Sequence, residues 1–191
     1  MNEPLSDKNA VAADDRPPLP EPVERFILQW GDLGSIWGVN RTIAQIHALL
    51  YVADKPLNAE DIAATLNVAR SNVSNSLKEL QGWNLIRRVP IKGDRRDHFE
   101  AETDLWEVAL RIAAGRKARE IDPIHDVLSE CAQQARADDG VSPIARERLA
   151  QMDKFVAELS GWYSEMLTLP RGNIASLVKL GARVARALGK S

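Results

Sequence analysis

A short polar stretch in the middle of the chain carries the side chains with the most evident chemistry. Between residues 70 and 81, Val73, Leu77 and Leu80 recur at three- and four-residue spacing, which predicts a helix with one face in a core. The opposite face carries short polar side chains and cations that can hydrogen-bond to phosphates and base edges. This face favours a helix that lies in the major groove of DNA. Its side chains are Arg70, Ser71, Asn72, Ser74, Asn75 and Lys78.

A second, shorter helix is predicted just before this one. Asn58 can accept a hydrogen bond from an amide near Asp61, which makes it a candidate N-cap, and the acids of the first turn suit the positive end of the helix dipole. Ile62 and Leu66 recur at helical spacing and should face a core, and the helix should end at Asn67. Two short helices across a tight turn are typical of a helix-turn-helix.

The residues after the second helix predict a basic β-hairpin. Apolar and β-branched residues run from Leu85 to Ile91, a glycine-containing turn follows, and a return strand should extend from Asp97 to Ala101. Between residues 87 and 97, five cations outnumber two acids, a local charge of +3 in a chain whose formal total is -2. The positive charge is therefore concentrated where a phosphate backbone would lie.

Each of these features has a simpler explanation when it is taken alone. The polar helix face can be an ordinary solvated face, and the hairpin can be an ordinary charged turn. Their succession at this spacing favours a winged helix-turn-helix that contacts DNA. We assign base reading to Asn72, Ser74 and Asn75, with Ser71 on the same face. The candidate phosphate contacts are Arg70, Lys78, Lys92, Arg95 and Arg96.

The same residues resemble a known family. The run LNVARSNVSNSLKELQGWNLIRR, followed by GDRR, is similar to the MarR superfamily, and Asp94 and Arg96 match its D-x-R wing signature. The upstream segment WGDLGSIWGVNRTIAQIHALLYVADKPLNAEDIA resembles its GbsR branch more narrowly. The resemblance covers about residues 23–105 and implies a dimeric transcriptional regulator, with a repressor as the expected type. Asn84 departs from the glycine of many members, but asparagine tolerates the left-handed conformation.

The N-terminal part predicts a tail and then an aromatic helix. Residues 1–21 hold acids and prolines with few large apolar groups, which indicates a disordered tail. From Pro22 onward, apolar residues at helical spacing include Trp30 and Trp37. The MarR resemblance implies control by a small ligand, and some GbsR relatives are implicated in responses to choline-type osmolytes. A choline or betaine effector would bind aromatic faces such as these two tryptophans offer, although both can also be plain core residues.

The C-terminal half predicts long helices that join two copies of the chain. Thr103 or Asp104 should cap the first of them, and Asp104 with Glu107 three residues on has the spacing of a capping box. Pro123 should kink or restart the helix, and Ser142 with Pro143 should begin the next one. An apolar four-three alternation then favours a coiled-coil-like seam, although the helix can also cover its own core. The seam residues, which we expect at the dimer interface, are Leu149, Met152, Val156, Leu159, Tyr163 and Met166.

The predicted organisation has three parts. Residues 1–21 form the tail, residues 22–103 a winged helix-turn-helix domain, and residues 104–191 a helical dimerisation region whose last helix is capped by Asn173. The expected fold class is mainly α with a small β-hairpin wing.

Composition argues against several other classes of protein. The chain has one cysteine, Cys131, which excludes an internal disulfide, and no apolar run approaches the ~18 residues of a membrane span. The first residues lack a signal-peptide core, so we expect a cytoplasmic protein that binds no membrane. Three dispersed histidines, without a Cys-x-x-Cys pair or a glycine-rich phosphate loop, argue against an enzyme and predict neither metal nor cofactor.

The favoured function is sequence-specific binding of double-stranded DNA by a homodimeric transcriptional regulator, with possible effector control. An alternative is a winged-helix adaptor or chromosome-associated protein that binds DNA or protein without an effector. Occupancy of a few promoters would favour the regulator, and broad, sequence-independent coverage would favour the adaptor. The sequence identifies neither the operator nor the regulated genes.

Overall fold

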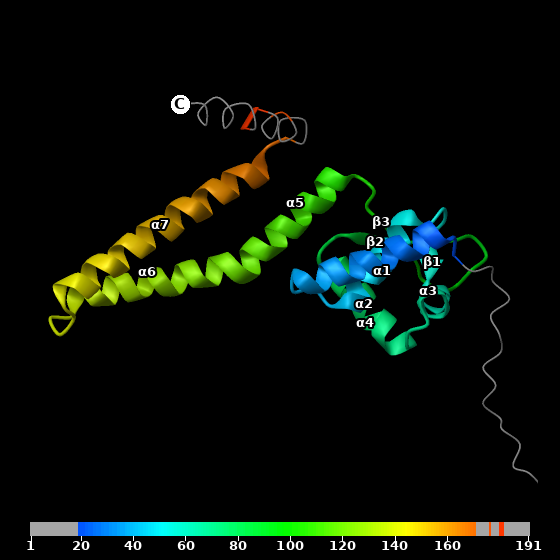
Figure 1. The fold of residues 1–191 in the computed structure, drawn as a ribbon, viewed down its shortest axis with the longest axis horizontal. Coiled ribbons are helices and arrows are strands. Elements are labelled where there is room, and N and C mark those ends of the chain that lie inside the picture. The colour runs from blue at the N-terminus through cyan, green and yellow to red at the C-terminus, as the bar shows by residue number, and fades with distance from the viewer. Residues whose placement is uncertain (1–18, 171–175, 177–179, 182–191) are drawn as a thin grey trace, which may run out of the picture. The chain divides into compact units, whose positions relative to one another are not determined.

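The computed structural model describes residues 19–170, 176 and 180–181. It divides into two compact units, Met1–Ala101 and Glu102–Ser191 (Figure 1). Helices predominate in the described part, where three short strands form one antiparallel sheet, so the predicted fold class is confirmed. Residues 1–18 of the predicted tail and most of the predicted last helix lie outside the described residues. None of the helices searched in the described part is both long and apolar enough to cross a membrane.

The first unit is a winged helix-turn-helix. Strands β2 and β3 form the predicted hairpin, and the two-residue strand β1, which was not predicted from the sequence, pairs with β3 through Leu57–Phe99 and Asn58–His98. The sheet order is therefore β1-β3-β2. The elements are α1 (Glu21–Ile36), α2 (Arg41–Val52), β1 (Leu57–Asn58), α3 (Ala59–Leu66), α4 (Arg70–Gly82), β2 (Ile86–Val89) and β3 (His98–Ala101).

Asparagine side chains fix several helix ends in this unit. Asn58 accepts from the Asp61 amide at 3.0 Å, which confirms the predicted cap of α3, and Asn40 caps α2 in the same way at 2.9 Å. Asn67 and Asn84 adopt left-handed backbone conformations after α3 and α4, with φ of 51° and 55°. Asparagine at position 84 thus makes the same turn that glycine would allow.

The core of this unit lies between α2 and the helix-turn-helix. Ile46, Ile62 and Val73, from α2, α3 and α4, are each 0% exposed, and Leu77 and Leu80 of α4 are also buried. Full burial of a side chain of this size contributes about 1.5–3 kcal/mol. Helix α4 is therefore held by its apolar face, and its opposite face remains available to a partner.

Two glycines allow α1 to pack closely on α2. Gly31 and Gly34 are buried on the side of α1 that faces α2. A Cβ at position 34 would lie 2.5 Å from the Cβ of Ala44, and one at position 31 would lie 2.6 Å from Cγ of Gln45. Glycine has a low helix propensity, and the close backbone contact between α1 and α2 explains why glycines occupy these two positions in α1.

The second unit is built on a helical hairpin in which α7 runs back along α6 (Figure 1). Asp104 and Ser142 cap α5 and α7, as predicted. Pro123 lies in the first turn of α6, so the predicted restart occurs there, and a π-helical segment links it to α5. The elements are α5 (Leu105–Arg116), η1 (Lys117–Ile121), α6 (Asp122–Ala137) and α7 (Pro143–Thr168).

Two side chains of α7 tie this hairpin together. The Tyr163 hydroxyl donates to the Ala113 carbonyl of α5 at 3.2 Å. At the other end, Arg146 donates to the carbonyls of Asp138 and Val141 in the loop between α6 and α7, at 3.0 and 3.3 Å. The second unit is therefore fastened within the chain at both ends of α7.

Candidate nucleic-acid interface

The polar face of α4 lies on the surface, as a DNA-reading face must. Val73, Leu77 and Leu80 turn inward, and the side chains between them turn outward. Arg70, Ser71, Asn72, Asn75 and Lys78 are exposed and Ser74 is half-buried.

A groove of about 430 Å³ separates this helix from the wing. Ser74 and Lys78 of α4 line one side and Arg95 of the wing lines the other, so candidate base and phosphate contacts face the same space. The groove also holds two acids, Glu60 and Asp97. The structure thus brings the two predicted DNA-contacting elements together around one mixed but mainly cationic surface.

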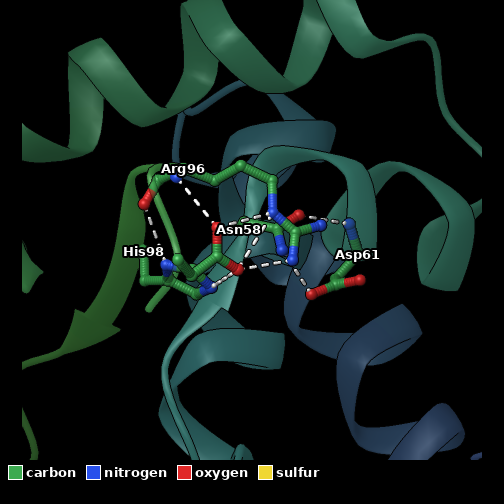
Figure 2. A network of polar contacts seen from close by, with 5 residues as sticks. Asn58, Asp61, Arg96 and His98 are labelled. Carbon is green, nitrogen blue, oxygen red and sulfur yellow. Dashed lines mark hydrogen bonds and ion pairs between the residues drawn. The ribbon is translucent and has the colours of Figure 1, made fainter. Parts of the chain in front are cut away.

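A polar cluster fixes the base of the wing (Figure 2). Asp94 accepts from Arg96 at 2.5 to 3.0 Å, through two guanidinium nitrogens and the backbone amide, and these hydrogen bonds hold the pKa of Asp94 well below its usual range. His98 is buried, with Nδ1 3.0 Å from the Arg96 carbonyl and Nε2 3.5 Å from Asp94. The two residues of the D-x-R signature therefore bind each other and set the wing's shape.

The cations of the surface fall into two groups. Arg70 is paired with Glu60 at 2.6 Å, and Arg88 is paired with Asp97 at 2.7 Å. Lys78, Lys92 and Arg95 have no ion pair or hydrogen bond among the described residues, and all are exposed. These last three are the most direct candidates for phosphate contacts, because no internal carboxylate has to be displaced first.

The candidate base readers Asn72 and Asn75 line a second hollow of about 290 Å³. Its other wall is the beginning of α2, with Asn40 and Thr42. Ser74 lies in the main groove instead, so the three candidate base readers do not share one pocket. The three side chains are instead distributed along the outer face of α4, between the two hollows. A helix that lies along a groove of DNA requires this distribution.

Sequence reasoning missed the role of α3 in this surface. Glu60 and Asp61 were assigned only to the helix dipole, yet Glu60 binds Arg70 and the Asn58 side chain donates to the Asp61 carboxylate at 2.7 Å. Glu60 and Arg70 belong to different helices, so no periodicity in the sequence links them. The acids in the first turn of α3 were the sequence signal that could have indicated such a pair.

The two candidate ligand-binding tryptophans lie at different exposures. Trp30 is half-buried on α1, with its ring centroid 5.7 Å from that of Phe26. Trp37, at the end of α1, is 57% exposed. Trp30 therefore packs against Phe26 within α1, whereas more than half of the Trp37 surface is exposed to solvent.

The candidate dimer residues of α7 differ in their exposure. Leu149, Val156, Tyr163 and Met166 are half-buried, whereas Met152 and Leu159 are 51% and 41% exposed. Phe155 and Trp162, which the predicted seam omitted, are 61% and 58% exposed. The helix thus carries a broad apolar face, part of which is half-buried and part of which is exposed to solvent.

No feature of the described part resembles a catalytic centre. In the described ranges, no group of three or more His, Cys, Asp or Glu side chains could hold a metal ion. His47 is buried in α2, and desolvation lowers its pKa from 6.5 to about 4, so it is a neutral core residue near pH 7. His98 belongs to the wing cluster, and His125 is half-buried on α6.

Comparison with known proteins agrees with this geometry. Residues 37–97, which include the helix-turn-helix and most of the wing, match the model of the MarR family. These residues therefore form a MarR-family domain. The curated relatives that match the chain are transcriptional regulators rather than enzymes, which agrees with the predicted class of function.

Two curated relatives come from Bacillus subtilis (strain 168). The chain is 22% identical to the HTH-type transcriptional repressor OpcR over 133 residues, 66% of this chain and 68% of OpcR. It is 21% identical to the HTH-type transcriptional repressor GbsR over 86 residues, 45% of this chain and 47% of GbsR. The match to GbsR agrees with the branch that the N-terminal segment resembles.

Solved structures support the fold. The crystal structure of a transcriptional regulator matches with a TM-score of 0.52 and 22% sequence identity, and the match covers 76% of this chain and 95% of the other. At this identity the likeness concerns the fold alone.

Proposed function

We propose that this regulator is a sequence-specific repressor that binds DNA as a homodimer. Residues 22–103 read the DNA and residues 104–191 join the two copies. The observation that carries the proposal is the exposed polar face of α4, which lies beside a wing whose Lys92 and Arg95 have no carboxylate partner in the described part. The names of the relatives OpcR and GbsR, both repressors, support the direction of regulation.

The exposed side of α7 supports dimerisation. Met152, Phe155, Leu159 and Trp162 follow three-four-three spacing along the helix, and each is at least 41% exposed. A second copy that packed its own α7 against this row would remove these side chains from water, at ~25 cal/mol for each Å² of apolar surface. Two-fold symmetry would then place the two reading heads on half-sites about one helical turn, ~34 Å, apart.

Mobility shifts with genomic fragments, followed by footprinting, test the DNA claim. We expect complexes whose affinity falls steeply with salt, and a near-palindromic footprint at a few promoters. Broad, sequence-independent protection would favour the adaptor or chromosome-associated alternative instead. The absence of any salt-dependent complex would refute the proposal.

Sedimentation equilibrium tests the dimer. Phe155→Lys places a charge in the exposed apolar row and should shift the protein toward the monomer. Ala157→Lys adds the same charge at an exposed position on the opposite side of the helix, so it is the matched control and should leave the dimer intact. A wild-type protein that is monomeric at micromolar concentration would contradict this part of the proposal.

We also propose control by a small effector of the choline or betaine type. Trp37 offers an exposed aromatic face that suits a quaternary ammonium group, and Trp30 lies two turns earlier on the same helix. Calorimetry with choline and with glycine betaine tests this. Heat that disappears in Trp37→Ala supports an effector site, and no heat at millimolar ligand removes the effector while the DNA claim stands.

A further inference from the structure

We propose that Glu60, in the first turn of α3, is a specificity-determining residue of the DNA-binding surface. Its carboxylate holds the Arg70 guanidinium and competes with DNA phosphates for it, which weakens sequence-independent binding. This inference rests on the proposed DNA-binding function and assigns a role to an acid outside the reading helix and the wing.

The first support is the geometry of the pair. Nη2 of Arg70 lies 2.6 Å from Oε1 of Glu60, and the side chains are 69% and 39% exposed. Arg70 is the first residue of α4, on the same outward side as the candidate base readers. A phosphate that approaches the start of α4 therefore meets a guanidinium that already has an anionic partner.

The second support is the position of Glu60 between the two DNA-contacting elements. It lines the groove together with Lys78 of α4 and with Arg95 and Arg96 of the wing. Its charge also reaches the base of the wing: the hydrogen bond to Asp94 raises the pKa of Arg96 most, and the charges of Asp61 and Glu60 raise it further. One carboxylate thus faces the cations of both elements, and Figure 2 shows the Arg96 side chain extending from the wing toward Asp61 in the same turn of α3.

The consequence for binding follows from the exposure of the pair. Exposed ion pairs are weak, so a well-placed phosphate can replace the carboxylate at Arg70. A duplex that also hydrogen-bonds to the asparagines of α4 gains enough other contacts to hold that position. A duplex without those contacts gains only the exchange of one anion for another and brings its phosphates close to Glu60. Repulsion between Glu60 and the phosphates therefore weakens binding to duplexes that lack the preferred sequence more than binding to the preferred site.

The test measures binding to two duplexes by fluorescence anisotropy over a range of salt concentrations. One duplex is a random sequence of about 30 base pairs, long enough for two half-sites one turn apart, and the other is the site that the wild-type protein selects from a random pool. Glu60→Gln removes the charge and leaves the size nearly unchanged. Glu24→Gln, at an exposed glutamate of α1, makes the same change in net charge away from the groove and is the matched control.

Glu60→Gln should bind the random duplex about five-fold more tightly per subunit at ~0.15 M salt, with a log-log salt slope steeper by about 0.9, because Arg70 then neutralises one more phosphate. Affinity for the selected site should rise less, so the specificity ratio falls. Arg70→Gln breaks the same pair from the other side and should weaken binding to both duplexes. If the pair only stabilised the fold, the two variants would change binding in the same direction.

The double variant Glu60→Gln/Arg70→Gln shows whether Glu60 acts through Arg70. We expect it to bind the random duplex like Arg70→Gln alone, and a gain that persists without Arg70 would overturn the inference. An unchanged affinity of Glu60→Gln, or an equal gain in Glu24→Gln, would also overturn it while the proposed function stands. A wild-type protein that binds neither duplex would refute the proposed function and this inference together.

Discussion

His47 should make the stability of the protein fall between pH 6.5 and pH 4. Its side chain is buried in α2, its Nε2 has no hydrogen-bond partner among the residues that the structure describes, and desolvation lowers its pKa from 6.5 to about 4. The unfolded chain takes up a proton near pH 6.5, whereas the folded protein resists protonation until about pH 4. The unfolded state therefore binds more protons in this range, and the free energy of unfolding decreases as the pH falls.

The size of the effect follows from the difference between the two pKa values. Each unit of pKa corresponds to about 1.36 kcal/mol, so the full loss below pH 4 is about 3 kcal/mol. At pH 5, where most of the unfolded chain is protonated at this position, about 2 kcal/mol is already lost. The effect should level off above pH 7, where both states hold a neutral imidazole.

Urea unfolding at pH 7.5 and pH 5, at constant protein concentration, measures this loss. His47→Leu keeps an apolar side chain in the site and should reduce the pH dependence by about 2 kcal/mol relative to the wild type. His125→Leu, on the more exposed surface of α6, is the control and should keep the wild-type pH dependence. Equal losses of stability in the wild type and His47→Leu between the two pH values would refute the reasoning.

Three further changes test the packing that positions the interface. Gly34→Ala should destabilise the protein by about 1–3 kcal/mol in thermal unfolding, because its Cβ would lie 2.5 Å from that of Ala44; a neutral result would contradict the close contact. Gly82→Ala, with open space around its Cβ, should instead stabilise by about 0.4–1 kcal/mol. Asp94→Asn removes the anionic partner of Arg96 and should speed amide exchange in β2 and β3 at neutral pH. In the wild type the protection factors of the same amides should fall only below about pH 4, because the pKa of Asp94 is lowered and its charged form persists to acid pH; unchanged protection in the variant would count against the cluster.

The sequence predicted most of the reading head because its signals are local. The spacing of Val73, Leu77 and Leu80 determines which face of α4 turns inward, and that assignment leaves the polar face outside. The caps at Asn58, Asp104 and Ser142 are also visible in sequence, because each acts on amides within a few residues.

Contacts between distant segments could not be predicted in the same way. Strand β1 has two residues, too few for a periodic pattern, and it exists because Leu57 meets Phe99 on β3. The Arg70–Glu60 pair joins two helices, and the groove that it borders forms only when the wing folds beside α4.

The heptad pattern of α7 was ambiguous for a related reason. A four-three alternation is satisfied equally by packing on the same chain and by packing on another. The structure shows Leu149, Val156 and Tyr163 half-buried beside a more exposed row that includes Phe155 and Trp162. The predicted seam thus mixed residues of both rows, and its assignment to a dimer stays a prediction.

The central claim is that the surface formed by α4 and the wing binds DNA, and the salt dependence of binding tests it most directly. Replacing Lys78, Lys92 and Arg95 together by glutamine should lower the log-log salt slope by about 0.9 for each cation, which gives about 2.7 per subunit and about 5.4 for a dimer. Replacing the exposed cations Arg25, Lys55 and Arg148 makes the same change in net charge elsewhere and should leave the slope unchanged. Equal slopes for the two triple variants would contradict the account.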